Sequence, residues 1–174
     1  MKTFILSALA VVVCGIVTIT AVMAESTTQQ KILELKREII NIQNKGKLGF
    51  NNVTFCSEIQ GFGMYTPLPG STVPGKQFYV YYEPANPYTK IESGKYITHL
   101  TQDLYLLDTK GNVLFGKEKA LQFYYEAVAP VLDIYISNTI TLTDAPKGKY
   151  VWKAVLHDEL RGESVTITKE FVVE

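Results

Sequence analysis

The alternation of apolar and polar residues between residues 134 and 156 is the feature that most restricts how this chain can fold. Alternation with a period of two indicates a strand with one buried face. The first alternating run is interrupted by residues 144–148, which have the composition of a turn, and a second run follows. Two half-buried strands joined over such a corner suggest a Greek-key sandwich. The apolar positions are Ile134, Ile136, Ile140 and Leu142 in the first run and Tyr150, Trp152, Ala154 and Leu156 in the second.

Tyr150 stands directly after this corner. In sandwich folds, a tyrosine near the start of the penultimate strand can return its hydroxyl group to the backbone of the preceding corner. We therefore expect Leu142, Gly148, Tyr150 and Trp152 to form a structural corner, with Trp152 in the core behind it. An up-and-down barrel is the alternative architecture, and the corner argues against it.

Strand patterns continue along the chain from about residue 50. Residues 108–112 and 158–162 are typical of hairpin loops, and residues 66–75 and 84–94 are expected to be loops. Gly61 and Gly63 suggest a bulge or a close backbone approach. Residues 122–128 are either a further strand or a crossing loop. The pattern predicts an all-β antiparallel sandwich of about seven or eight strands over residues 47–174. The expected strands are 52–59, 77–83, 95–107, 113–115, 134–142, 150–156 and 164–173.

The first 24 residues have the pattern of a signal peptide. Lys2 precedes an apolar run, and the run ends in Val22-Met23-Ala24, which matches a cleavage site. Cleavage near Ala24 would place the protein in the periplasm or outside the cell. The alternative is an uncleaved anchor, because the run is almost long enough to span a membrane.

An amphipathic helix is expected over residues 25–46, with Gly46 at its C′ position. Its apolar stripe could form a short coiled coil and make the protein a dimeric scaffold. It could equally pack on its own domain or act as a spacer, since two heptads are fewer than a secure coiled coil needs. The residues of this possible homodimer contact are Ile32, Leu35, Ile39 and Ile42.

Residues 142–173 carry a family resemblance. The order of leucine, turn, Gly-Lys-Tyr, strand, aspartate, glycine and strand resembles the C-terminal half of immunoglobulin-like and fibronectin-III-like modules of secreted bacterial proteins. The resemblance implies an immunoglobulin-like β-sandwich. Residues 55–65 are similar to exported proteins of planctomycete-type bacteria, a likeness that implies export and no particular activity. The residues that carry the first resemblance are Leu142, Pro146, Gly148, Tyr150, Asp158, Gly162 and Phe171.

Charge and cysteine content exclude several classes. The chain has 17 basic and 17 acidic residues, and this balance favours neither nucleic acid nor an anionic membrane as a partner. After cleavage Cys56 would be the only cysteine, so no internal disulfide could form. Because Cys56 lies among apolar residues, we expect it to be buried, with pairing between chains as the alternative.

No catalytic or metal-binding pattern is visible. His99 and His157 are the only histidines, and neither has a second histidine at metal-ligand spacing. Of the run His157-Asp158-Glu159, only His157 and Glu159 could converge on one face of a strand. No phosphate-binding loop, dinucleotide fingerprint or nucleophile elbow occurs. The sequence therefore predicts no enzyme, no cofactor and no metal.

The tyrosine-rich composition suggests a binding surface. Tyr79, Tyr81 and Tyr135 fall on the parity that we expect to face outward, where tyrosines suit sugar stacking or a protein interface. The alternative is that they pack under loops. The leading prediction is a non-catalytic exported module that binds a protein or the envelope surface. A carbohydrate-binding module is the second hypothesis, and the helix-mediated dimeric scaffold is the third.

Overall fold

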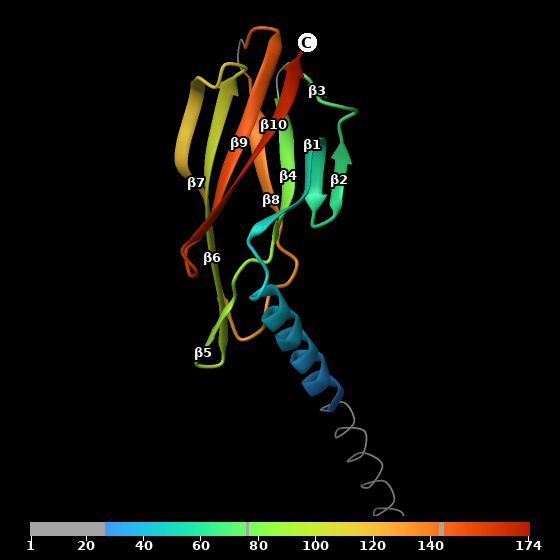
Figure 1. Cartoon of the computed structure of the whole chain (residues 1–174). Coiled ribbons are helices and arrows are strands. Elements are labelled where there is room, and N and C mark those ends of the chain that lie inside the picture. Colours follow the sequence, from blue (N-terminus) through green and yellow to red (C-terminus); the bar gives the residue numbers. More distant parts are fainter. Residues whose placement is uncertain (1–26, 76, 143–144) are drawn as a thin grey trace, which may run out of the picture. The chain divides into compact units, whose positions relative to one another are not determined.

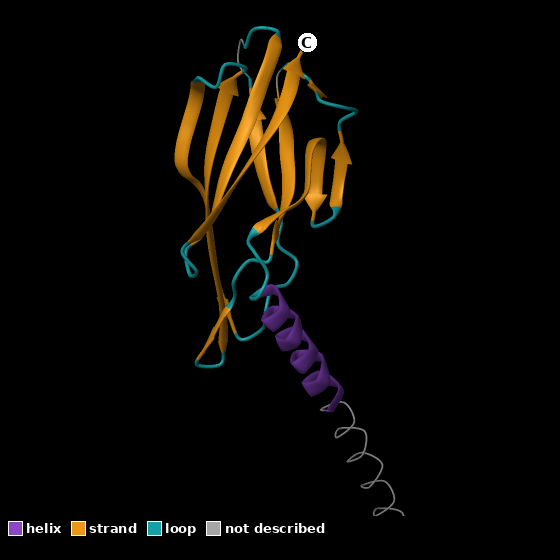
Figure 2. Ribbon diagram, in the orientation of Figure 1, coloured by secondary structure: helices purple, strands orange, loops and turns teal. Residues whose placement is uncertain are grey.

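The computed structural model describes residues 27–75, 77–142 and 145–174. The protein is mostly β-structure with one helix (Figures 1 and 2). The chain divides into two compact units, Met1–Ile39 and Ile40–Glu174. The predicted signal peptide, including the cleavage site at Ala24, lies outside the described residues, and export stays a prediction.

The helix extends over residues 27–43. It is shorter than predicted because the backbone changes at residues 44–46 to tight turns, in which Gly46 N–H donates to Gln43 O at 2.9 Å. Gly46 does not take the left-handed conformation of a C′ glycine. A glycine is needed there for another reason, since a Cβ atom would meet the Asn86 side chain at 2.4 Å. Among the described residues, no helix is long and apolar enough to cross a membrane.

Ten strands follow the helix (Figure 1). Six of them are long: β1 (Gly49–Gly61), β4 (Gln77–Ala85), β6 (Lys95–Asp108), β7 (Val113–Ala127), β9 (Gly148–Asp158) and β10 (Glu163–Val173). The other four are β2 (Met64–Pro67), β3 (Thr72–Val73), β5 (Lys90–Glu92) and β8 (Ile136–Thr141).

The strands form two sheets. The first has the order β2-β1-β4-β8. The second has the order β3-β10-β9-β6-β5, with β7 paired to the other side of β6. All pairs are antiparallel except β3 with β10. Strands β7 and β8 are therefore edge strands of different sheets.

Side chains of both sheets meet in one hydrophobic core. Phe55 of β1, Phe78 of β4 and Phe171 of β10 form an aromatic cluster with ring centroids 5.1–5.6 Å apart. Tyr82 of β4 lies against Trp152 of β9. Alternate residues of β9 are buried, as the predicted period of two requires. Cys56 is fully buried, as predicted, and burial raises the pKa of its thiol.

The bulge expected at Gly61 is confirmed by a register shift between Ile59 and Gly61, beside a hairpin turn in which Gly63 has φ +66°. Other strand predictions were wrong in detail. The predicted loops 66–75 and 84–94 contain the short strands β3 and β5. Residues 113–115 and 122–127 belong to one long strand, β7, which the sequence pattern divided because of a bulge. The predicted hairpin at residues 108–112 is confirmed, and Asp108 Oδ1 accepts the Lys110 and Asn112 N–H groups.

Candidate ligand pocket

A pocket of about 450 Å³ lies between β6 and β7 of one sheet and the edge strand β8 of the other. Its walls are mainly aliphatic and aromatic, with a few polar groups. Cavities of this size and composition are typical of small-molecule sites. The lining residues are Leu104, Tyr105, Leu106, Phe115, Lys117, Ala120, Leu121, Ser137, Asn138, Thr139, Ile140, Thr141, Leu142 and Trp152.

The wall on the larger sheet follows from strand register. Trp152 of β9 pairs with Leu106 of β6, which pairs in turn with Phe115 of β7. Side chains that are paired across neighbouring strands lie on the same face of the sheet. These three residues therefore form one row of the wall. In the next row Leu104 pairs with Lys117, which brings a lysine to an otherwise apolar surface.

A bulge in β7 with three residues opposite one shapes the side of the pocket. Gln102 pairs with Leu121 and Leu104 pairs with Lys117, so that residues 118–120 all lie opposite Asp103. Lys119 takes a left-handed conformation at φ +46°. A bulge of this kind bends its strand and redirects the side chains on either side of it. Here Ala120 of the bulge and the flanking residues Lys117 and Leu121 all line the pocket.

The bulge is held by a chain of hydrogen bonds on the outer face of the sheet. Asp103 Oδ1 accepts the Lys119 backbone N–H at 2.8 Å, and Asp103 Oδ2 lies 2.9 Å from His157 Nε2. Partial burial opposes ionisation of Asp103, but the hydrogen bonds from Lys119 and His157 prevail and lower the pKa of its carboxyl group. The anionic form of Asp103 thus stabilises the backbone of the bulge.

Two donor groups of the pocket lack partners. Trp152 is almost completely buried, yet its Nε1–H group has no hydrogen-bond partner among the described residues. The exposed Lys117 is the only charged residue of the lining, and its ammonium group makes no ion pair within the described part of the chain. Buried polar groups nearly always have a partner, so the indole N–H is the more unusual of the two.

A satisfied polar cluster borders the pocket. Tyr82 donates its hydroxyl hydrogen to Gln102 Oε1 at 2.8 Å, and Gln102 Nε2 donates to Asn138 Oδ1 at 3.0 Å. Asn138 Nδ2 returns a bond of 3.2 Å to Gln102 Oε1. Burial raises the pKa of the Tyr82 hydroxyl, so this group stays protonated as a donor. Because Gln102 and Asn138 form hydrogen bonds with each other, the buried amide of Asn138 presents few unpaired hydrogen-bonding groups to the pocket.

The three predicted surface tyrosines lie outside the pocket. Tyr81 is on the outer face of its sheet, as expected, but it is fully buried because Tyr65 and Tyr135 cover it, with ring centroids at 4.2 and 5.7 Å. Its hydroxyl donates to Glu83 Oε1 at 2.6 Å, and burial together with Glu83 raises the pKa of Tyr81 to about 12. Tyr135 keeps 38% of its surface exposed, and Tyr79 is half-buried. The tyrosine group is thus mainly a packed stack.

Some of the predicted corner residues line the pocket and the others do not. Tyr150 donates to Pro146 O at 2.7 Å and stacks on Phe171, and Gly148 begins β9 with φ +154°. Leu142 and Trp152 line the pocket. The sequence predicted only a structural role for both residues. The alternation of residues shows which face of a strand is buried, but it does not show whether other side chains fill the space next to that face.

The histidines do not form a metal site. His157 pairs with Asp103, whereas Glu159 accepts the Thr101 hydroxyl group at 2.6 Å. His99 lies 3.0 Å from the Gln122 side chain. No group of three or more potential metal ligands occurs within residues 27–75, 77–142 and 145–174.

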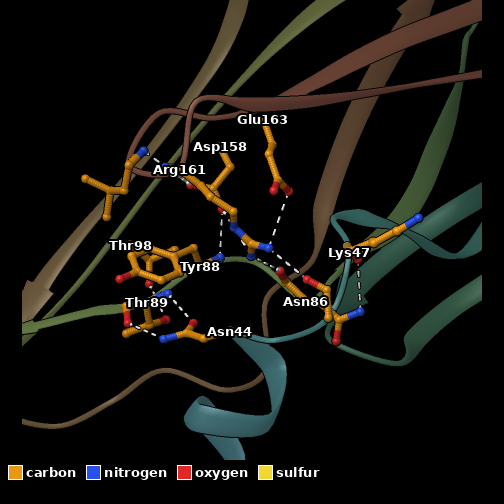
Figure 3. Close-up of polar contacts among 11 residues, drawn as sticks. Asn44, Lys47, Asn86, Tyr88, Thr89, Thr98, Asp158, Arg161 and Glu163 are labelled. Carbon is orange, nitrogen blue, oxygen red and sulfur yellow. Dashed lines mark hydrogen bonds and ion pairs between the residues drawn. The ribbon is translucent and has the colours of Figure 1, made fainter.

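Arg161 is the centre of a separate polar network (Figure 3). Its guanidinium group donates to Gly46 O at 2.7 Å and to Asn86 O at 2.9 Å, and it lies over the ring of Tyr88. Asp158, fully buried, accepts the Tyr88 N–H at 2.7 Å. These bonds satisfy backbone groups of two loops and join both loops to the turn between β9 and β10. The network therefore stabilises the end of the domain near residues 44–47 and is not an open site.

Comparison with known proteins gives one described likeness. No protein-family model matches the chain, and no curated protein matches it. Among solved structures it is similar to the alkylpurine DNA glycosylase AlkC of Pseudomonas fluorescens, bound to DNA containing an abasic site analogue. The TM-score is 0.40 and the identity 13%, over 79% of this chain and 34% of that chain. The chain thus spans about a third of the length of that enzyme.

This comparison contradicts two of the sequence-based predictions, because the neighbour is a DNA-bound enzyme. The first is the prediction of a non-catalytic exported module that acts by surface binding, with its carbohydrate-binding and dimeric-scaffold alternatives. The second is the prediction about partners, namely that the chain binds a protein or a glycan, forms a homodimer and does not bind nucleic acid. Both are withdrawn. At this TM-score, glycosylase activity and DNA binding remain properties of that protein.

The proposed dimer residues Ile32, Leu35, Ile39 and Ile42 are all exposed.

Proposed function

We propose that this protein binds a small, mainly apolar molecule in the pocket between β6, β7 and β8. The observation that carries the proposal is the pocket itself, which has a volume of about 450 Å³ and is lined mainly by aliphatic and aromatic side chains, Trp152 among them. Pockets of this size and lining suit small molecules. The proposal involves no catalytic step.

The apolar lining supports the same conclusion. Leu104, Leu106, Phe115, Leu121 and Ile140 offer aliphatic and aromatic surface to a guest. An apolar guest would remove this surface from water, which is favourable by about 25 cal/mol per Å². Tyr79, Tyr81 and Tyr135 take no part, so the proposed site differs from the withdrawn surface-binding predictions.

Trp152 is the only tryptophan among the 174 residues, and it therefore reports on the pocket directly. We expect 1-decanol, added to the full chain below its aggregation limit, to change the Trp152 emission in a saturable manner. The single indole N–H signal in a ¹H–¹⁵N spectrum should shift in the same saturable manner, because the Trp152 side chain lines the pocket. A linear, unsaturable response or an unmoved indole signal would count against the proposal.

A pair of variants separates filling of the pocket from general damage. Ala120→Phe places a ring in the pocket, and we expect it to abolish the response to 1-decanol. Ala127→Phe adds the same ring at another half-buried position of β7 that does not line the pocket, and should leave binding unchanged. Thermal unfolding of both variants shows whether each is folded. Binding that survives in folded Ala120→Phe would exclude this pocket.

We also propose that the two sheets form an immunoglobulin-like sandwich. In that fold the first, second and fifth strands share a sheet, and the third, sixth and seventh share the other. The corresponding division here is β1, β4 and β8 against β6, β9 and β10. The bond from Tyr150 to Pro146 O supports the same assignment, since it has the form of a tyrosine corner. An experimental structure with β8 in the sheet of β6 would contradict it.

A further inference from the structure

Lys117 differs from every other residue of the pocket lining. It is the one charged side chain there, it is exposed, and no carboxylate among the described residues neutralises it. A lysine can lay its aliphatic stem along an apolar wall and keep its ammonium group in water. Lys117 thus offers a positive charge at the rim of an apolar pocket.

The backbone around Lys117 is fixed and not a mobile strand end. Lys117 is the last residue that pairs with β6 before the bulge, and the Asp103 carboxylate binds the bulge two residues later. The bulge thus fixes the backbone position from which the Lys117 side chain extends into the pocket lining. No ion pair within the described part of the chain holds its ammonium group elsewhere.

From this arrangement we infer that the ligand is an aliphatic carboxylate, an acyl chain whose acid group pairs with Lys117 while the chain fills the pocket. The inference rests on the proposed function and names the chemical class of its ligand. A carboxylic acid of ordinary pKa is ionised at neutral pH. Its charge would stay at the hydrated rim, because burying an unpaired charge is costly. Phosphate and sulfate head groups are also negatively charged, but they are bulkier than a carboxylate.

The test compares three ligands of equal chain length, decanoate, 1-decanol and decylamine, by the emission of Trp152 in the full chain. Lys117→Met should raise the Kd of decanoate about three- to fivefold at low ionic strength, the range of an exposed ion pair. It should leave the Kd of 1-decanol within about twofold, since the alcohol has no charge to pair. Lys117→Arg should keep the affinity for decanoate, and decylamine should bind more weakly than 1-decanol to the unaltered protein.

Lys149→Met is the matched control. It removes the same charge from an exposed position of β9 outside the pocket lining, and its Kd for decanoate should remain that of the unaltered protein. Added salt should reduce the advantage that Lys117 gives to decanoate.

Three results overturn the inference. The first is equal weakening of decanoate and 1-decanol binding by Lys117→Met, the second is no effect of Lys117→Met on either ligand, and the third is the same effect from Lys149→Met. Each would show that Lys117 does not select an acid group. If 1-decanol binds and decanoate has no dependence on Lys117, the pocket proposal stands and only the carboxylate is wrong. If neither ligand changes the Trp152 signal, the proposed function itself fails.

Discussion

The carboxylate of Asp103 accepts the backbone N–H of Lys119 at 2.8 Å, across a bulge that places three residues of β7 opposite one residue of β6. This bond joins the outer face of the sheet to the shape of the pocket. His157 holds the other oxygen of the same carboxylate. The side chain that fixes the bulge is therefore itself fixed from a third strand, β9.

Replacing Asp103 tests the role of this bond. Asp103→Ala leaves the Lys119 N–H without its acceptor and should destabilise the protein by about 1–3 kcal/mol. It should also weaken binding of 1-decanol, because the bulge that shapes the pocket is released. Urea unfolding and Trp152 emission measure the two effects. Asp133→Ala, at an exposed aspartate outside the pocket lining, is the control and should change neither.

The contribution of Asp103 should depend on pH. Its pKa is lower in the folded protein than the ordinary value of 3.8, so the carboxylate stabilises the fold fully above pH 3.8. That contribution is lost as the pH falls through the lower folded pKa, where both states bind the proton. Urea unfolding of the unaltered protein and of Asp103→Asn should show a stability difference that shrinks as the pH falls below 4. A difference that grows below pH 4 would contradict the assignment.

Arg161 should be among the most sensitive positions for stability. Arg161→Ala removes donors from the carbonyl groups of Gly46 and Asn86 and leaves buried Asp158 without its neighbouring cation. We expect a loss of about 2–4 kcal/mol in the free energy of unfolding. Arg161→Lys should recover only part of it, because an ammonium group cannot reproduce the two-sided fork of a guanidinium group.

The measurement is urea unfolding followed by circular dichroism. Lys147→Ala, at an exposed residue of the corner, is the control and should stay within about 0.5 kcal/mol of the unaltered protein. Equal stability of Arg161→Ala and Lys147→Ala would show that the network of Figure 3 contributes nothing measurable.

Tyr150 tests the corner. Tyr150→Phe removes the hydroxyl group that bonds to Pro146 O but keeps the ring that stacks on Phe171. The expected cost is about 1 kcal/mol, the net value of a single hydrogen bond. Tyr65→Phe, in the stack with Tyr81, is a matched change of the same atom and should cost less. Thermal unfolding measures the change in Tm of each variant. Equal changes would contradict a particular contribution of the corner hydrogen bond to stability.

Much of the local structure could be predicted from the sequence. The period of two over residues 134–156 indicated which faces of two strands are buried, and Trp152, Ala154 and Leu156 are indeed in the core. Turn-forming residues located the hairpin at residues 108–112. These predictions succeeded because they depend on neighbours in the chain, where side-chain direction and turn chemistry decide the outcome.

The rest depends on contacts between distant residues. Tyr81 has the parity of an exposed residue but is buried, since Tyr65 and Tyr135 cover it from other parts of the chain. The bulge in β7 made one strand resemble two short ones, because residues 118–120, opposite the single residue Asp103, interrupt the regular pairing with β6.

What the sequence alone determined is the mostly β character of the protein and the inward face of its strands. Only the tertiary structure decided that β7 and β8 are edges of different sheets and that a pocket remains between them. It also decided that Trp152 and Lys117, 35 residues apart in the chain, line that same pocket. Alternation is a property of each strand taken singly, whereas a cavity depends on how far apart two sheets lie and which side chains fill the space between them.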